Sequence, residues 1–107
     1  MIEFKPLNEM QGSASYIAAD GDEKLGFAEF TYQGFEMKFT SLECADDSVK
    51  EGLMRSAMNY CANRMSYTST IKAEMLCPAA NRLGFTSDKL TVEIPEALAS
   101  TCCACSK

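Results

Sequence analysis

Apolar and polar residues alternate along the stretch from Phe35 to Cys44, near the middle of the chain. Phe35, Met37 and Phe39 stand at every second position, and mostly polar residues stand between them. A period of two is typical of a β-strand with one buried face, so this stretch is predicted to be a strand. Similar alternation predicts shorter strands at residues 2–5, 15–19, 25–32, 71–76 and 90–94.

The periodicity becomes helical after this strand. Apolar residues now recur at spacings of three and four, which places them on one stripe of an amphipathic helix: Val49, Leu53, Ala57, Tyr60, Cys61 and Met65. Ser48, followed three residues later by Glu51, forms a capping box and is predicted to begin the helix. The step from the strand directly into the helix leaves backbone N–H groups unpaired at the helix start. These groups, together with the helix dipole, can bind an anion.

Turn residues and prolines divide the rest of the chain. Residues 20–23 and 33–34 are tight-turn signals, so the strands that they connect are expected to form an antiparallel meander. Pro6 is expected to end the first strand, and residues 7–13 to form a loop or one helical turn. The polar residues 66–70 should break the long helix, and Pro78 should begin a short helix over residues 78–82 that Gly84 closes.

These elements predict an α/β or α+β fold with one mostly antiparallel central sheet and a long crossover helix. The chain of 107 residues is long enough for one domain with a modest core, which we place at residues 1–96. Residues 97–107 show no clear period and are expected to form a cysteine-rich tail. The strand at residues 90–94 should lie at an exposed edge, which would allow a homodimer.

Charge and hydropathy narrow the classes of partner. The formal net charge is −5, so the chain is not expected to bind nucleic acid or an anionic membrane. The sequence contains no apolar run near the roughly 18–20 residues that span a bilayer. The first residues lack the charged and apolar regions of a signal peptide, and we therefore expect a cytoplasmic protein.

Six cysteines and the absence of histidine restrict the possible chemistry. Without histidine, Ser–His and Cys–His nucleophile pairs are excluded within one chain. Cys61 stands on the apolar helix stripe, and the missing signal peptide argues against disulfides, so free thiols are expected at least for Cys44, Cys61 and Cys77. A secreted, disulfide-linked domain is disfavoured for the same reasons.

Three further thiols lie within four residues near the C-terminus: Cys102, Cys103 and Cys105. This cluster could bind Zn²⁺ or Cu⁺ with a fourth ligand from elsewhere, although it lacks the C-x-x-C spacing of zinc knuckles. A redox or intermolecular disulfide role is equally open, and so is a tail without a structural role.

The order of elements and two short motifs resemble the GNAT superfamily of acyl-CoA N-acyltransferases. Asn81-Arg82-Leu83-Gly84-Phe85 is similar to the family's Tyr-Glu-Lys-Leu-Gly-Phe segment, and residues 53–57 are similar to the Leu-Leu-x-x-Ala run of its long helix. The likeness covers most of residues 25–94, and the chain lacks the two helices that usually follow the family's first strand. The resemblance implies that acetyl-CoA lies in a V-shaped gap between two neighbouring strands, and that a small-molecule or peptide amine accepts the acyl group.

The resemblance also implies where the cofactor would be held. The family's pyrophosphate loop, Arg/Gln-x-x-Gly-x-Gly/Ala, falls on residues 45–50. This chain lacks the basic residue and the small residues of that motif at the corresponding positions. The cofactor-binding residues that it implies are Cys44, Ala45, Asp46, Asp47, Ser48, Val49, Lys50 and Asn81. Asp46 and Asp47 could instead attract a cation or an amine, or simply favour the helix start by charge–dipole attraction. Lys50 could reach a phosphate or be an ordinary solvated residue.

Two side chains are candidates for catalysis. Cys77 would end the strand that faces the acyl-binding gap in GNAT proteins, where its thiolate could accept or attack an acyl group. A buried, inert cysteine is the alternative. Glu43 lies on the strand before the long helix, where a base for the amine often sits in such folds. The family's general-acid tyrosine falls on Ala80.

Two hypotheses about function follow from these observations. The first is a small acyl-CoA-dependent N-acyltransferase, which the order of elements favours. The second is a binding or interaction protein with the same fold but without transferase activity, whose cysteine tail binds metal or a redox partner. The altered pyrophosphate loop favours the second hypothesis.

Overall fold

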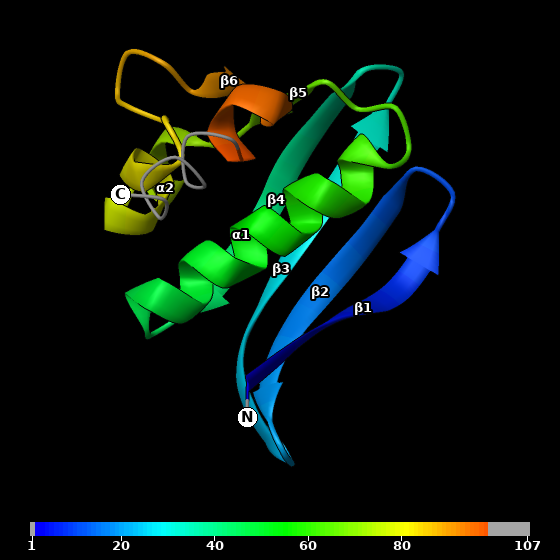
Figure 1. Cartoon of the computed structure of the whole chain (residues 1–107), viewed down its shortest axis with the longest axis vertical. Coiled ribbons are helices and arrows are strands. Elements are labelled where there is room, and N and C mark those ends of the chain that lie inside the picture. The colour runs from blue at the N-terminus through cyan, green and yellow to red at the C-terminus, as the bar shows by residue number, and fades with distance from the viewer. Residues whose placement is uncertain (1, 99–107) are drawn as a thin grey trace.

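The computed structural model describes residues 2–98. Within these residues one mixed sheet has the strand order β1-β2-β3-β4-β5-β6, and α1 crosses one of its faces (Figure 1). The elements follow one another as β1 (Ile2–Met10), β2 (Ser13–Asp20), β3 (Glu23–Gln33), β4 (Glu36–Cys44), α1 (Asp47–Ala62), β5 (Thr68–Thr70), the 3₁₀ helix η1 (Ala73–Met75), α2 (Pro78–Arg82) and β6 (Thr91–Glu93).

The connections between the strands define an α+β fold. Strands β1 to β4 form an antiparallel meander, α1 then crosses over to β5, which is parallel to β4, and β6 returns antiparallel to β5. The turns before β3 and β4 contain Gly21 and Gly34 at φ of 65° and 61°, a conformation that glycine adopts without strain. The predicted combination of a mostly antiparallel sheet and a long crossover helix is confirmed.

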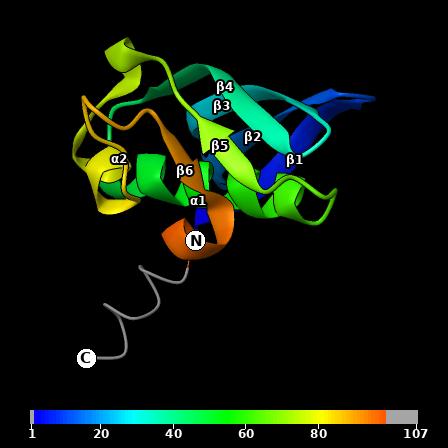
Figure 2. The same ribbon diagram turned by 90° about the horizontal axis from the view of Figure 1, so that it is seen from above.

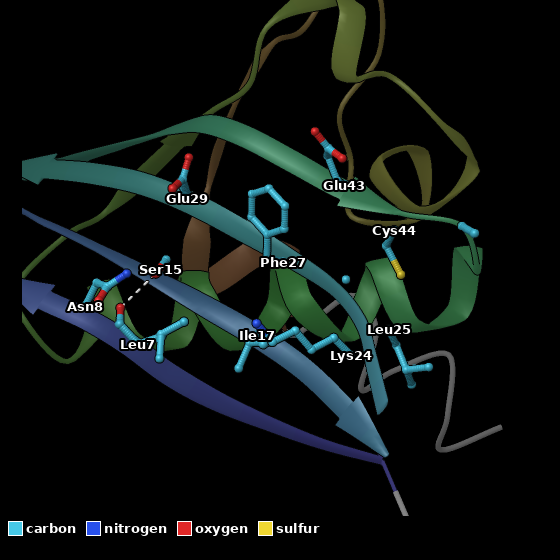
Figure 3. A pocket seen from close by; sticks show the side chains of 12 residues that line it. Leu7, Asn8, Ser15, Ile17, Lys24, Leu25, Phe27, Glu29, Glu43 and Cys44 are labelled. Atoms are coloured by element: carbon cyan, nitrogen blue, oxygen red, sulfur yellow. Dashed lines mark hydrogen bonds between the residues drawn. The ribbon is translucent and has the colours of Figure 1, made fainter. Parts of the chain in front are cut away.

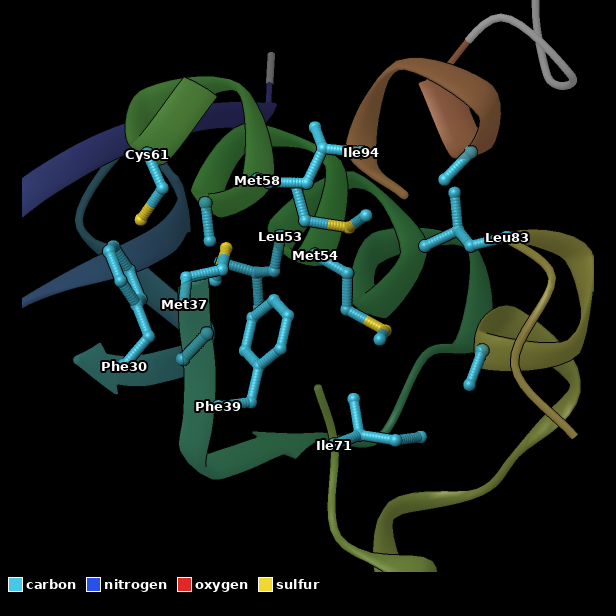
Figure 4. Close-up of a cluster of buried hydrophobic side chains, with 14 of the residues drawn as sticks. Phe30, Met37, Phe39, Leu53, Met54, Met58, Cys61, Ile71, Leu83 and Ile94 are labelled. Atoms are coloured by element: carbon cyan, nitrogen blue, oxygen red, sulfur yellow. The ribbon is translucent and has the colours of Figure 1, made fainter. Parts of the chain in front are cut away.

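The core lies between α1 and the inner face of the sheet, the face on which Figure 2 shows both α-helices. Figure 4 shows Phe30 of β3 directed toward Cys61 of α1, and Phe39 of β4 directed toward Leu53 of α1. Residues of the predicted helix stripe are buried from Val49 to Cys61. Met65 is 71% exposed, because α1 ends at Ala62 and Met65 adopts a positive φ of 79°.

A glycine sets how closely α1 approaches the first strand. A Cβ atom on Gly52 would lie 2.3 Å from Cζ of the Phe4 ring, which is well inside van der Waals contact. Phe4 projects from β1 and packs against the buried core. The absence of a side chain at residue 52 therefore allows the Phe4 ring to lie directly on the helix backbone.

The start of α1 differs from the prediction. Asp46, not Ser48, is the N-cap, and its carboxylate accepts a hydrogen bond from the Val49 amide at 3.0 Å. Glu51, the expected capping-box partner of Ser48, instead accepts a hydrogen bond from Nε of Arg82. Since Asp46, Asp47 and Ser48 are all acceptable N-caps, the sequence around them does not select one.

The first strand is longer than predicted. β1 continues through Pro6 to Met10, so the expected end at Pro6 and the expected loop at residues 7–13 are both wrong. Proline is tolerated here because β1 lies at the edge of the sheet and pairs with a neighbouring strand on one side only. The N–H donor that proline lacks can therefore be on the side without a partner strand.

The segment after α1 also differs from the prediction. Residues 66–70, expected to be a polar break, contain β5, whereas residues 71–76, expected to be a strand, contain η1. The alternation of Ile71, Ala73 and Met75 imitates a strand, but only Ile71 of these three is buried. β5 has a fully buried serine, Ser69, because it pairs with β4 on one side and β6 on the other.

The last part of the described chain agrees more closely with the prediction. α2 begins at Pro78 as expected, and Gly84 follows it with φ of 106°. The predicted strand at residues 90–94 is shortened to β6, at the second edge of the sheet. Residues 94–98 are helical, and Ala97 is buried in the core, so the chain continues to pack beyond Pro95.

Candidate functional site

Strands β4 and β5 pair over a short distance and then separate. Their parallel pairing joins residues 36–38 to residues 68–70. Beyond Thr70 the chain turns away, and the Ile71 amide donates a hydrogen bond to the Leu90 carbonyl at 2.9 Å. The second half of β4 therefore has no parallel partner, and Lys72 Nζ donates to its Thr40 carbonyl at 3.4 Å.

A cavity of about 380 Å³ occupies the space between the separated segments. We call it the gap cavity, and its lining residues are 40–43 of β4, Lys50 of α1 and 74–77. Three of the predicted site residues line it together: Glu43, Lys50 and Cys77. The cavity thus combines a carboxylate, an ammonium group and a half-buried thiol from three different segments.

The N-terminus of α1 is surrounded by the chain's own carboxylates. Asp46 caps the Val49 amide, and Asp47 accepts a hydrogen bond from the Ala79 amide at 3.0 Å, in the first turn of α2. Asp47 also forms an ion pair with Arg82. The hydrogen bond from Arg82 lowers the pKa of the Asp47 carboxyl below its ordinary value. The sequence suggested a cation or amine near Asp46 and Asp47, and the cation that the structure places at Asp47 is Arg82.

The other predicted cofactor-binding residues lie away from the gap cavity, and two of them, Cys44 and Ala45, line a different cavity. Ala45 and Ser48 are exposed, and Val49 is buried in the core. Cys44 donates a hydrogen bond from Sγ to the Asp46 carbonyl at 3.4 Å. Asn81 is exposed on α2, where its amide donates to the Cys77 carbonyl at 2.9 Å as part of the helix. None of these five residues lines the gap cavity. Ala80, which stands at the position of the family's general-acid tyrosine, is buried.

A second cavity, of about 500 Å³, lies on the outer face of the meander, opposite α1 (Figure 3). We call it the outer cavity. It has an apolar floor that includes Leu7, Ile17 and Phe27, and its charged side chains are Glu29, Glu43 and Lys24. The sequence pattern does not predict this site, although the alternation of side chains along β2 and β3 already separates Ile17 and Phe27 from the core face.

Glu43 lines both cavities. It is directly opposite Phe27 in the pairing of β3 and β4, and its side chain is exposed. A group bound in the outer cavity beside Glu43 would therefore lie next to the gap cavity as well.

The first three thiols are free, as predicted: Cys44, Cys61 and Cys77. Burial raises the pKa of the Cys61 thiol to about 12, so this side chain stays protonated and belongs to the core. The proposed metal ligands Cys102, Cys103 and Cys105 lie outside the described residues. Across residues 2–98, no group of three or more histidine, cysteine or carboxylate side chains is positioned to hold a metal ion.

Comparison with protein-family models, curated proteins and solved structures gave no match for this chain. Among the helices in the described part of the chain, none has both the length and the apolar character that crossing a membrane requires.

Proposed function

We propose that this chain is a small GNAT-like domain that binds acyl-CoA in the gap cavity and transfers the acyl group to a primary amine. The observation that carries the proposal is the separation of the parallel strands β4 and β5 after three paired positions. The resulting cavity is lined by Glu43, Lys50 and Cys77, three residues that the sequence predicts as site residues.

The gap cavity suits the narrow acyl end of the cofactor better than its phosphates. A volume of about 380 Å³ is within the range of ordinary small-ligand pockets, roughly 300–1,000 Å³. The start of α1 does not fit a pyrophosphate, because the carboxylates of Asp46 and Asp47 occupy its positive end. Lys50 lines the cavity and is the side chain that can approach a phosphate from this wall.

Acyl-CoA supplies an acyl group on a sulfur leaving group, so that a C–N bond to the amine forms as the C–S bond breaks. In the proposed transfer Glu43, whose side chain lines both cavities, takes one proton from the ammonium group of the substrate, and the departing CoA thiolate takes the proton that the nitrogen loses as the C–N bond forms. Cys77 lies on the wall facing β4, where it can carry the acyl group in a two-step route or contact it in a direct transfer.

A non-catalytic binding protein with the same fold is the second candidate. The observation that favours it is the ion pair of Asp47 with Arg82 beside the N-terminus of α1. The charges of this pair offset each other, and the Asp46 carboxylate that caps α1 leaves the helix start negative, which opposes a phosphate ligand.

Calorimetric titration with acetyl-CoA and with free CoA, under reducing and metal-free conditions, tests the first candidate. A ligand that binds only the folded state stabilises it by about 2.7 kcal/mol at a hundredfold excess over Kd, so a thermal shift should accompany binding. Lys50→Glu should weaken binding at least tenfold, whereas Lys89→Glu makes the same charge change at an exposed site outside the gap cavity.

The outcomes of this titration separate the two candidates. Micromolar binding that depends on Lys50 supports the acyltransferase, and Cys77→Ala then shows whether turnover needs the thiol. Absence of binding at millimolar CoA overturns the acyltransferase and leaves the binding protein. In that case, Zn²⁺ titration of the full chain, with the cysteines at 102, 103 and 105 replaced by serine as the control, becomes the next experiment.

A further inference from the structure

Two rows of side chains cross the outer face of the meander. In the first row, Leu7 pairs with Ser15, Ser15 with Glu29, and Glu29 with Ser41. The neighbouring row joins Ile17 to Phe27 and Phe27 to Glu43. The register alone therefore places an apolar surface beside two carboxylates that come from different strands.

The meander is irregular around these rows. The ladders shift register between Ala18 and Ala19 and between Glu29 and Phe30, and such bulges bend and twist the strands. Gly26 lines the cavity where β3 lies close to β4, since a Cβ atom on it would be 2.5 Å from the Glu43 carbonyl oxygen. These features fix the shape of the outer cavity in the backbone itself.

The charges around the cavity select one kind of ligand. Figure 3 shows Phe27 between Glu29 and Glu43, and Ile17 lies on the neighbouring strand β2, where it pairs with Phe27. A cationic nitrogen would gain from the two carboxylates, while its apolar substituent would cover Phe27 and Ile17. Lys24 lines the same cavity and would repel a second positive charge, so a monoamine fits better than a polyamine.

We infer that the outer cavity binds a primary monoamine carried on an apolar body, of which 2-phenylethylamine is a simple example. Glu43 connects this site to the gap cavity, so the bound amine would be the acceptor in the proposed acyl transfer. That last role rests on the proposed function, whereas binding of the amine does not.

The experiment is a calorimetric titration of the full chain with 2-phenylethylamine in the absence of any CoA compound. We expect saturable binding that Glu43→Gln and Phe27→Ala each weaken at least tenfold. Glu36→Gln is the matched control, because it removes the same charge from the same strand at an exposed position outside both cavities. Glu43→Gln nearly preserves side-chain shape, so it remains informative if Phe27→Ala does not fold.

Three related compounds test the chemistry of the ligand. 2-Phenylethanol lacks the charge, phenylalanine adds a carboxylate and spermidine adds further ammonium groups, and each should bind at least tenfold more weakly than 2-phenylethylamine. Equal or tighter binding of any of them would contradict the inference. So would the absence of saturable binding of 2-phenylethylamine at millimolar concentration.

Failure of amine binding in the outer cavity and failure of CoA binding in the gap cavity can be distinguished. Amine binding that depends on Glu43 supports the outer cavity as a site even where CoA does not bind, since the titration contains no CoA. CoA binding without amine binding overturns this inference and leaves the gap cavity unaffected.

Discussion

The two faces of the meander are built from the same strands but differ in how far their side chains are exposed to water. On the inner face, Ala28, Phe30 and Phe39 are almost completely shielded from water by α1. On the outer face, Ile17 and Phe27 remain partly exposed beside carboxylates. Because side chains alternate along a strand, each β-strand contributes to both faces at once. Substitutions at neighbouring positions can therefore alter the stability of the core and the proposed amine site separately.

The largest expected difference between the faces is the cost of removing an aromatic ring. Phe30→Ala should lower the free energy of unfolding by about 3–5 kcal/mol, because it leaves a cavity in the core. Phe27→Ala on the same strand should cost roughly 1 kcal/mol, since part of that ring is already in water. Urea unfolding followed by circular dichroism measures both values. Similar losses for the two variants would contradict the distinction between the faces.

A smaller effect tests how tightly α1 packs on the inner face. Gly52→Ala should lower stability by about 1–3 kcal/mol, because the new methyl group meets the Phe4 ring. In a Phe4→Ala background the same change should instead raise stability by about 0.5–1 kcal/mol, as expected for alanine in a helix.

This pair of measurements forms a double-mutant cycle. The reversal of sign is the decisive outcome, since an effect of Gly52→Ala that is the same in both backgrounds would show that Phe4 is not the obstacle. Thermal unfolding of the four proteins provides the comparison.

The smallest expected effect concerns the pH dependence of the contact between α1 and α2. The folded-state pKa of Asp47 is lowered by Arg82, so its contribution is complete above the ordinary carboxyl pKa of 3.8 and is lost as pH falls through the lowered value. Asp47→Asn should therefore lower the melting temperature at pH 7 and reduce its decline in acid. Asp88→Asn, at an exposed position outside both cavities, serves as the control. An unchanged acid profile for Asp47→Asn would contradict the role of this carboxylate.

Much of the fold follows from local pattern, whereas the details that create the sites do not. The period-two stretch ending at Cys44 and the apolar stripe beginning at Val49 predict β4 and α1, because burial of one face requires these spacings. The predicted end of the first strand at Pro6 is wrong, because the effect of a proline depends on whether its strand is at the edge of the sheet. The position of β1 at the edge is a property of the whole sheet. The predicted strand at residues 71–76 is wrong, because a short apolar alternation such as the one that begins at Ile71 is compatible with more than one structure.

The candidate sites depend on contacts that are distant in the sequence. The gap cavity exists because the Ile71 amide bonds to the Leu90 carbonyl and not to β4. The outer cavity needs the register of β2, β3 and β4, including two shifts, before Ile17, Phe27 and Glu43 come together. Periodicity predicts the face on which each residue lies, but not its neighbours across the sheet.

The contact between Asp47 and Arg82 has a consequence for motion. Through the Ala79 amide and the Arg82 guanidinium, it holds the segment that follows Cys77 against the first turn of α1. Both side chains are partly exposed, and salt screens such charges over a distance of about 8 Å at physiological ionic strength. Raising the ionic strength should therefore weaken this ion pair and loosen the segment that follows Cys77 from α1, and faster amide hydrogen exchange at Ala79 would report that change.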